Sequence, residues 1–152
     1  MIAWHRTNAD SQRLATIPSI GVVTATAIVS AIGDGKQFRS GREFSAWLGA
    51  VPRQNSSGGK ERLGRISKQG NAYVRRLLVV GATALLRGDC RKKAAGGAWF
   101  ADLLKRKPAR VATVALANKT ARVAWAVLTR GEVYRATTVS ANNAELSEAV
   151  AA

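Results

Sequence analysis

The chain has 152 residues and a formal net charge of +15, from 24 Lys and Arg against nine Asp and Glu. A charge that positive predicts a polyanionic partner, either nucleic acid or an anionic membrane surface. The length suits a single domain, and the 47% hydrophobic content excludes a wholly disordered chain. The longest apolar run, Leu77 to Leu86, has about half the length that spans a bilayer. We therefore expect nucleic acid and no membrane partner.

The single cysteine, Cys90, excludes an internal disulfide and indicates a reducing compartment. Residues 1–10 carry Trp4, His5 and Arg6 in place of the apolar segment of a signal peptide. A cytoplasmic, nucleoid-associated bacterial protein is the expected location. The opening residues do not read as a domain start, so we expect a fragment or truncated product.

Helical periodicity runs through most of the chain, and no alternating segment of useful strand length interrupts it. This pattern predicts the all-α class. The first predicted unit covers about 11–33: a short helix from Ser11 to Thr16, a turn over Ile17–Gly21, and a helix from Val22 to Ile32. Gly33 ends the second helix, as glycine commonly does.

Two helices joined by a turn of this kind are typical of a helix-hairpin-helix. The second helix would begin with the unpaired amides of Gly21, Val22 and Val23. Such amides bind a DNA phosphate at the positive end of the helix dipole, without reading sequence. The alternative is an ordinary helix-loop-helix corner with no ligand.

Ser40 and Glu43 fit a capping box that opens a helix to about Leu48. A basic loop over residues 49–68 follows, in which two serines precede two glycines. It predicts either a nucleophile presented to a phosphodiester or a plain phosphate-gripping turn. The serines and glycines are Ser56, Ser57, Gly58 and Gly59. The cations in and after the loop are Arg53, Lys60, Arg62, Arg65, Lys68, Arg75 and Arg76, with Glu61 the acid among them.

The remaining pattern predicts packed helices over about 71–87, 98–105 and 109–129, followed by a flexible tail over 136–152. The apolar stripe of the first of these would be Tyr73, Leu77, Val80 and Ala84. That of the last would be Val111, Val114, Ala121, Trp125 and Leu128. The aromatic side chains Trp47, Trp99, Phe100 and Trp125 are expected in the core more than on a base-stacking surface.

Metal chemistry finds little support in this chain. Two-metal phosphoryl transfer needs clustered carboxylates, and the nine acids are scattered. One cysteine and one histidine exclude a structural zinc site. We expect no cofactor in this chain.

Three blocks in order carry a family resemblance from about Leu14 to Arg135. They are IPSIGVVTATAIVSAIGD, FRSGREFSAWLGAVPRQNSSGGKERLGRISKQGNAYVRRLLVVGATALL and VALANKTARVAWAVLTRGEVYR. Together they resemble the C-terminal domain of the DEDD-type insertion-sequence transposases, the bridge-RNA-guided serine recombinases. The middle block is the specific part. Residues 1–135 would be that domain.

The resemblance implies that Ser57 attacks a DNA phosphodiester and becomes covalently joined to it, with Ser56 as the reserve candidate. It also implies a RuvC-like N-terminal domain with four acids and Mg²⁺, which these 152 residues lack. A guide (bridge) RNA and a homo-oligomer are the further partners expected of the full-length protein. This chain is then the serine half of a composite active site and is expected to be inactive alone.

Two positions depart from the family pattern. Ser19 stands where glycine is common, which is tolerable if that residue needs no positive φ. Asn118 stands where a basic residue is common, which removes one potential phosphate contact. The alternatives to a recombinase are a non-catalytic helix-hairpin-helix nucleic-acid-binding module, an inactive transposase remnant, and a bacterial RNA-binding protein.

Overall fold

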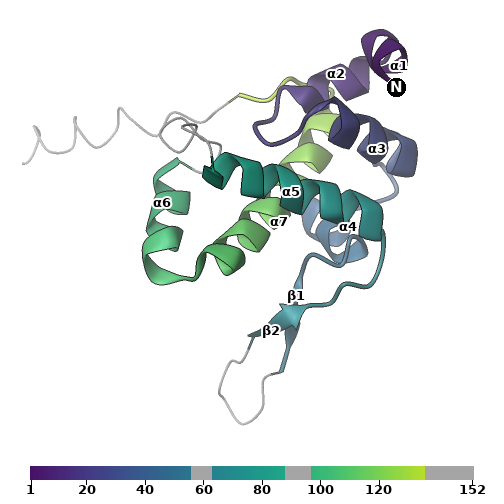
Figure 1. The fold of residues 1–152 in the computed structure, drawn as a ribbon. Helices are drawn as coiled ribbons and strands as arrows, with labels where there is room; N and C mark the ends of the chain where they lie inside the picture. The colour runs from purple at the N-terminus through teal and green to yellow at the C-terminus, as the bar shows by residue number, and fades with distance from the viewer. Residues whose placement is uncertain (56–62, 88–96, 136–152) are drawn as a thin grey trace, which may run out of the picture.

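The computed structural model describes residues 1–55, 63–87 and 97–135. These residues form seven helices and one two-stranded sheet (Figure 1). The helices are α1 (Ile2–Thr7), α2 (Ala9–Ala15), α3 (Val22–Ile32), α4 (Gly41–Trp47), α5 (Ala72–Arg87), α6 (Gly97–Arg106) and α7 (Ala109–Arg130), and the strands are β1 (Pro52–Gln54) and β2 (Leu63–Ile66). The predicted all-α class is confirmed, although α1 was not predicted. The predicted tail over 136–152 lies outside the described residues.

Helix α7 is the axis of the core, since α5, α4 and α2 all pack against it (Figure 1). Its buried face is rich in small side chains, among them Ala112, Ala121 and Ala124. Small side chains let neighbouring helices approach closely, and at the crossing with α4 a Cβ on Gly41 would lie 3.0 Å from the Arg122 carbonyl oxygen. Larger side chains fill the remaining space: Leu14, Ile28, Phe44, Leu78 and Leu116.

The buried face of α5 is Val74, Leu78 and Ala82, which differs from the predicted stripe. Tyr73 and Val80 are each 57% exposed. The prediction was wrong because two apolar stripes run along this helix about one residue apart. The contact with α7 selects the stripe that is buried, and a single helix does not encode that choice.

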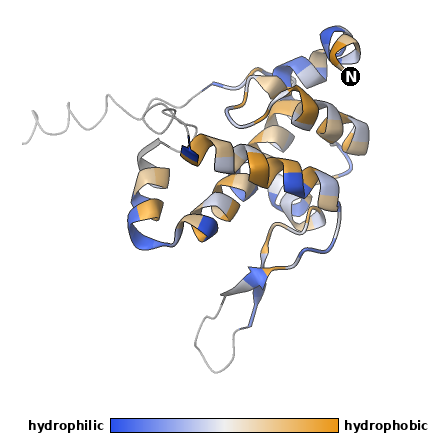
Figure 2. Ribbon diagram, in the orientation of Figure 1, coloured by the Kyte–Doolittle hydropathy of each residue, from blue (hydrophilic) through white to orange (hydrophobic). Residues whose placement is uncertain are grey.

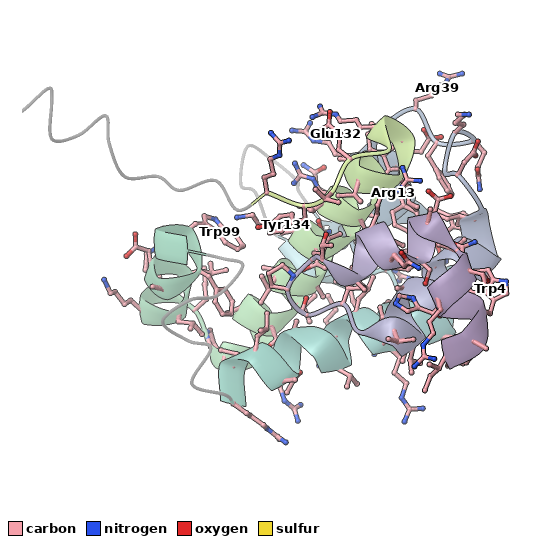
Figure 3. All side chains as sticks on the ribbon, turned by 90° about the horizontal axis from the view of Figure 1, so that it is seen from above. Trp4, Arg13, Arg39, Trp99, Glu132 and Tyr134 are labelled. Carbon is pink, nitrogen blue, oxygen red and sulfur yellow. The ribbon has the colours of Figure 1, made fainter. Side chains whose placement is uncertain are left out.

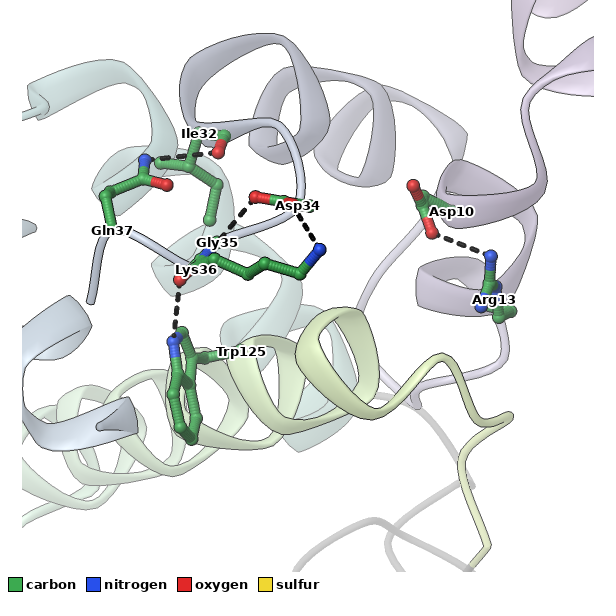
Figure 4. Close-up of polar contacts among 8 residues, drawn as sticks. All are labelled: Asp10, Arg13, Ile32, Asp34, Gly35, Lys36, Gln37 and Trp125. Carbon is green, nitrogen blue, oxygen red and sulfur yellow. Dashed lines mark hydrogen bonds and ion pairs between the residues drawn. The ribbon is translucent and has the colours of Figure 1, made fainter. Parts of the chain in front are cut away.

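The predicted burial of the aromatic residues is correct only in part. Phe100 is buried, and Trp125 is half-buried with its Nε1 donating to the Gly35 carbonyl at 3.1 Å (Figure 4). Trp47 and Trp99 are 38% and 41% exposed. The Gly35 bond ties the α3–α4 connection to α7.

The connection between α3 and α4 is organised by short-range polar contacts. Lys36 bonds to the Asp34 carboxylate through its ammonium and its amide, and these bonds lower the pKa of Asp34 (Figure 4). At the start of α4 the Ser40 hydroxyl accepts from the Glu43 amide at 3.2 Å. The Glu43 carboxylate accepts from the Arg39 amide at 2.7 Å, one residue earlier than a standard capping box places it.

The chain after α7 returns to the first helices, where the Tyr134 amide donates to the Thr16 hydroxyl at 3.0 Å (Figure 3). Helices α2 and α3 pack on each other next to this contact. Among the described helices, none has the length and apolar character needed to cross a bilayer.

The turn between α2 and α3 places Ser19 in the left-handed region, with φ at +77°. The Ile20 amide donates to the Ile17 carbonyl at 3.0 Å across the turn, with Pro18 at its second position and Ser19 at its third. A positive φ at the third position is the mark of a type II turn, where glycine is preferred. The serine is therefore strained, contrary to the condition under which we expected the departure from glycine to be tolerable.

We expect Ser19→Gly to raise the free energy of unfolding by up to about 1 kcal/mol. A left-handed non-glycine residue costs about 1–2 kcal/mol, from which the greater unfolded-state entropy of glycine and the lost 3.4 Å contact of the Ser19 hydroxyl with the Thr120 hydroxyl subtract. Urea unfolding followed by circular dichroism measures the change. The control is Ser30→Gly on the exposed side of α3, which should lower the free energy of unfolding by about 0.5 kcal/mol. An equal loss in both variants would contradict the strain at Ser19.

Candidate nucleic-acid interface

The segment expected to be a loop over 49–68 contains an antiparallel hairpin of β1 and β2. Pro52 pairs with Ile66 and Gln54 with Leu63, with an irregularity between the pairs. The Ser67 amide continues the ladder by donating to the Val51 carbonyl at 3.0 Å. Strands of three and four residues are too short for an alternating pattern, so the sequence did not reveal them.

Two polar contacts fix the base of the hairpin to α5 and α7, and a third joins its two sides. Arg75 of α5 donates from Nη1 to the Leu48 carbonyl at 2.7 Å. Asn118 of α7 donates from Nδ2 to the Ala50 carbonyl at 3.0 Å, and the Lys68 amide donates to the Gly49 carbonyl at 3.0 Å. From this base the hairpin projects away from the helices (Figure 1).

These contacts give two sequence-predicted positions a structural role. Arg75 is half-buried and holds the start of the hairpin. Asn118 lacks the positive charge that is common at its position, but its side-chain amide holds the segment before β1 through its hydrogen bond to the Ala50 carbonyl.

The predicted serine site falls where the structure describes no residues. Ser56, Ser57, Gly58, Gly59, Lys60, Glu61 and Arg62 all lie in 56–62, outside the described residues. The flanking strands carry Arg53 and Arg65, and Lys68 follows β2; all three are exposed. Arg76 is exposed on α5. The hairpin thus presents several positive charges on the two sides of the predicted serine segment.

The predicted phosphate site at the start of α3 lies apart from the hairpin. Gly21 is the N-cap residue, is exposed, and receives no side-chain cap. Val23 is 45% exposed, and Val22 is half-buried. In Figure 1 α3 lies in the upper part of the helical body, whereas the hairpin extends below it.

A groove of about 1550 Å³ runs beside the hairpin, along α7 and past the start of α4 and α6. Six cations line it, and none of the described residues that line it is acidic. They are Arg42, Arg65, Lys68, Arg110, Lys119 and Arg122. The ion pairs among the described residues are Arg13–Asp10, Lys36–Asp34 and Lys105–Asp102, none of which involves a groove cation.

Four of these cations were not predicted from the sequence: Arg42, Arg110, Lys119 and Arg122. Lys119 and Arg122 are three residues apart on one face of α7, whereas Arg110 lies about two and a half turns before Lys119 and therefore at the opposite edge of the groove-lining face. The i, i+3 pair was visible in the sequence, but the proximity of Arg42 and of the hairpin was not. Figure 2 shows hydrophilic segments at the hairpin and at the turn from α6 to α7.

Metal ligands do not gather in the described residues, where no three His, Cys, Asp or Glu side chains come together in a way that could hold an ion.

Comparison with known proteins gives a consistent picture. Residues 11–95 match the model of the Transposase IS116/IS110/IS902 family. A Pseudomonas aeruginosa PAO1 protein named "Probable family 20 transposase" is 51% identical over 130 residues, which cover 86% of this chain and 38% of that protein. The transposase for insertion sequence element IS1111A of Coxiella burnetii is 47% identical over 130 residues, covering 86% and 36%.

A shorter match reaches the pilin gene-inverting protein of Moraxella bovis, at 41% identity over 51 residues, or 34% of this chain and 16% of that protein. The chain thus spans little more than a third of the length of the two transposases it matches over most of its own length. The family match covers more than half of the chain and includes most of α2, all of α3 to α5, and the hairpin. The chain belongs to the IS116/IS110/IS902 transposase family.

Proposed function

We propose that this chain is the DNA-binding, serine-bearing part of a transposase and acts in DNA transposition. Family membership carries the proposal. The exposed cations Arg53, Arg65 and Lys68 on the hairpin add support, because they flank the segment that contains Ser57. Positive charge on both sides of a hydroxyl favours the approach of a phosphodiester and stabilises the charge that develops during attack.

The proposed reaction is a transesterification at phosphorus. The Ser57 hydroxyl loses its proton as its oxygen bonds to the phosphorus atom. The bond from phosphorus to the leaving DNA oxygen breaks, and that oxygen takes up a proton. The product is a serine–DNA phosphodiester, with the leaving strand released as a free hydroxyl. Ser56 is the reserve nucleophile.

The exposed start of α3 would anchor a second phosphate further along the DNA. Gly21 and the amides of Val22 and Val23 fit the helix-hairpin-helix mode of backbone binding. Further phosphates near the serine would be bound by Lys60, Arg62 and Arg76. Arg75 would support this site by holding the base of the hairpin.

The Mg²⁺ that the resemblance implies would be bound outside this chain, in the additional length of its relatives. A guide RNA and a homo-oligomer belong to the same proposal for the full-length protein. The alternative is a non-catalytic DNA-binding remnant, which would show the same charge and the same helices.

A covalent-trapping experiment tests the proposal. The chain is mixed with labelled duplex DNA, Mg²⁺, the separately expressed N-terminal part of a close relative and its RNA, and then run on a denaturing gel. We expect a protein–DNA adduct that Ser57→Ala abolishes and Ser56→Ala retains. Absence of an adduct in the unaltered chain, with DNA binding retained, would favour the non-catalytic alternative.

Salt dependence gives an independent prediction for duplex binding. Each phosphate that is neutralised contributes about −0.9 to the slope of log affinity against log salt. The cations on the hairpin predict a slope steeper than about −3. Fluorescence anisotropy with labelled duplex over a salt series measures it, and a shallower slope would argue against an extended basic surface.

A further inference from the structure

The groove beside the hairpin combines an apolar floor with a cationic rim. Its floor includes Ile66, Val111, Val114 and Val123, and the indole of Trp99 also lines it. A volume of about 1550 Å³ exceeds the roughly 300–1000 Å³ of most small-molecule sites. From this combination we infer that the groove binds an unpaired, single-stranded segment of nucleic acid.

The charge of the rim is complementary to a nucleic-acid backbone. Arg42, Arg65, Lys68, Arg110 and Arg122 are exposed, and none of them is in an ion pair with another described residue. Arginine and lysine in such a setting bind successive phosphates. The rim therefore selects a polyanion over a neutral polymer.

The apolar floor selects a single strand over a duplex. A duplex buries its base faces in its own stack and presents phosphates and groove edges to a protein. An unpaired strand exposes base faces, which bind apolar and aromatic side chains while the phosphates bind cations. The stretch of α7 from Arg110 to Arg122 is about 18 Å long at the helical rise. That length matches about five nucleotides at a stacked rise of about 3.4 Å.

Trp99 is the base-stacking side chain of the groove. Its indole is 41% exposed, and the Lys119 ammonium lies 4.5 Å from the ring centroid. Figure 3 shows Trp99 at the end of the molecule opposite Trp4. When a strand binds, the Lys119 ammonium can contact a phosphate and the Trp99 ring can stack on a base. These two contacts would replace the contact between the ammonium and the ring.

Binding of a single strand in the groove is separate from the covalent step and needs no reaction at Ser57. It is tested on the full 152-residue chain carrying Ser57→Ala, so that loss of strand binding and loss of adduct formation remain separate results. The probes are fluorescent oligothymidine, oligouridine and a duplex, each of about 12 nucleotides or base pairs, within the usual range of single-strand sites. Anisotropy over a salt series gives the affinity and the slope.

We expect this chain to bind both single strands, and we expect changes at Trp99 to weaken single-strand binding more than duplex binding. Trp99→Ala should weaken single-strand binding by about tenfold or more, whereas Trp99→Phe should retain most of it. The double variant Arg110→Ala/Arg122→Ala should weaken it by a similar factor and make the salt slope shallower by about 1.4. Arg6→Ala, an exposed cation outside the groove, is the matched control and should change affinity less than twofold.

Preference between oligothymidine and oligouridine identifies the strand: equal affinity indicates stacking and backbone contacts, and stronger oligouridine binding indicates RNA through its 2′-hydroxyls. A loss of duplex affinity in Trp99→Ala equal to its loss of single-strand affinity would overturn the inference. So would single-strand affinities in the Trp99→Ala and double variants that equal the unaltered value, with circular dichroism showing that both remain folded.

Discussion

Gly70→Ala is expected to lower the free energy of unfolding by about 3 kcal/mol or more. Gly70 joins the hairpin to α5 and has φ at +109°. A Cβ at this position would overlap the carbonyl oxygen of Trp47 at the end of α4. The substitution therefore combines about 1–2 kcal/mol of left-handed strain with about 1–3 kcal/mol for overpacking. Urea unfolding followed by circular dichroism measures the loss.

Gly33→Ala is the matched control for the close approach. Gly33 also has a positive φ, +58°, but a Cβ there would meet no atom within 4 Å. Its substitution should cost only the backbone strain of its φ of +58° and ψ of −125°, about 1–3 kcal/mol. A loss at Gly70 no larger than the loss at Gly33 would show that the hairpin base does not lie against the end of α4.

The helices could be predicted because their signals are local. The predicted bounds of α3 agree with the structure, and those of α7 differ by one residue. Capping at Ser40 was also predicted and is confirmed. Each of these features depends on residues within a few positions along the chain, and a single sequence records them directly.

The groove could not be predicted as a site because its parts meet only in the folded chain. Arg42, Arg65 and Arg122 come from α4, β2 and α7, which are far apart in the sequence. The close packing of α4 on α7 at Gly41 places Arg42 and Arg122 beside the same groove. The sequence predicted a basic loop, whereas the structure places two of its cations beside a helix whose own cations had gone unnoticed.

The wrong choice of buried face on α5 has the same origin. Both stripes of that helix are apolar, so periodicity alone could not separate them. The exposure of Tyr73 and Val80 follows from which stripe meets α7. Local pattern thus predicted that a helix forms, and the tertiary contact decided how it is oriented.

Charge reversal on the hairpin should nearly abolish duplex binding. In the variant Arg53→Glu/Arg65→Glu/Lys68→Glu, three exposed cations beside the proposed serine site become acids. Losing three phosphate contacts at about 0.9 log units each per decade of salt predicts at least a 100-fold loss of affinity near 0.1 M salt. Fluorescence anisotropy with labelled duplex measures the loss, and the slope of log affinity against log salt should become shallower by about 3.

The same change in net charge, made elsewhere, separates a binding site from general attraction. Arg6, Arg87 and Arg130 are exposed, and none lies on the hairpin or lines the groove. Reversing these three alters the long-range field but removes none of the proposed phosphate contacts, so the affinity should fall by about tenfold or less and the slope should change little. Equal losses in the two triple variants would mean that net charge attracts DNA to this chain without a defined site. A large loss confined to the hairpin variant would place the DNA backbone along β1 and β2, within reach of the serine segment that joins them.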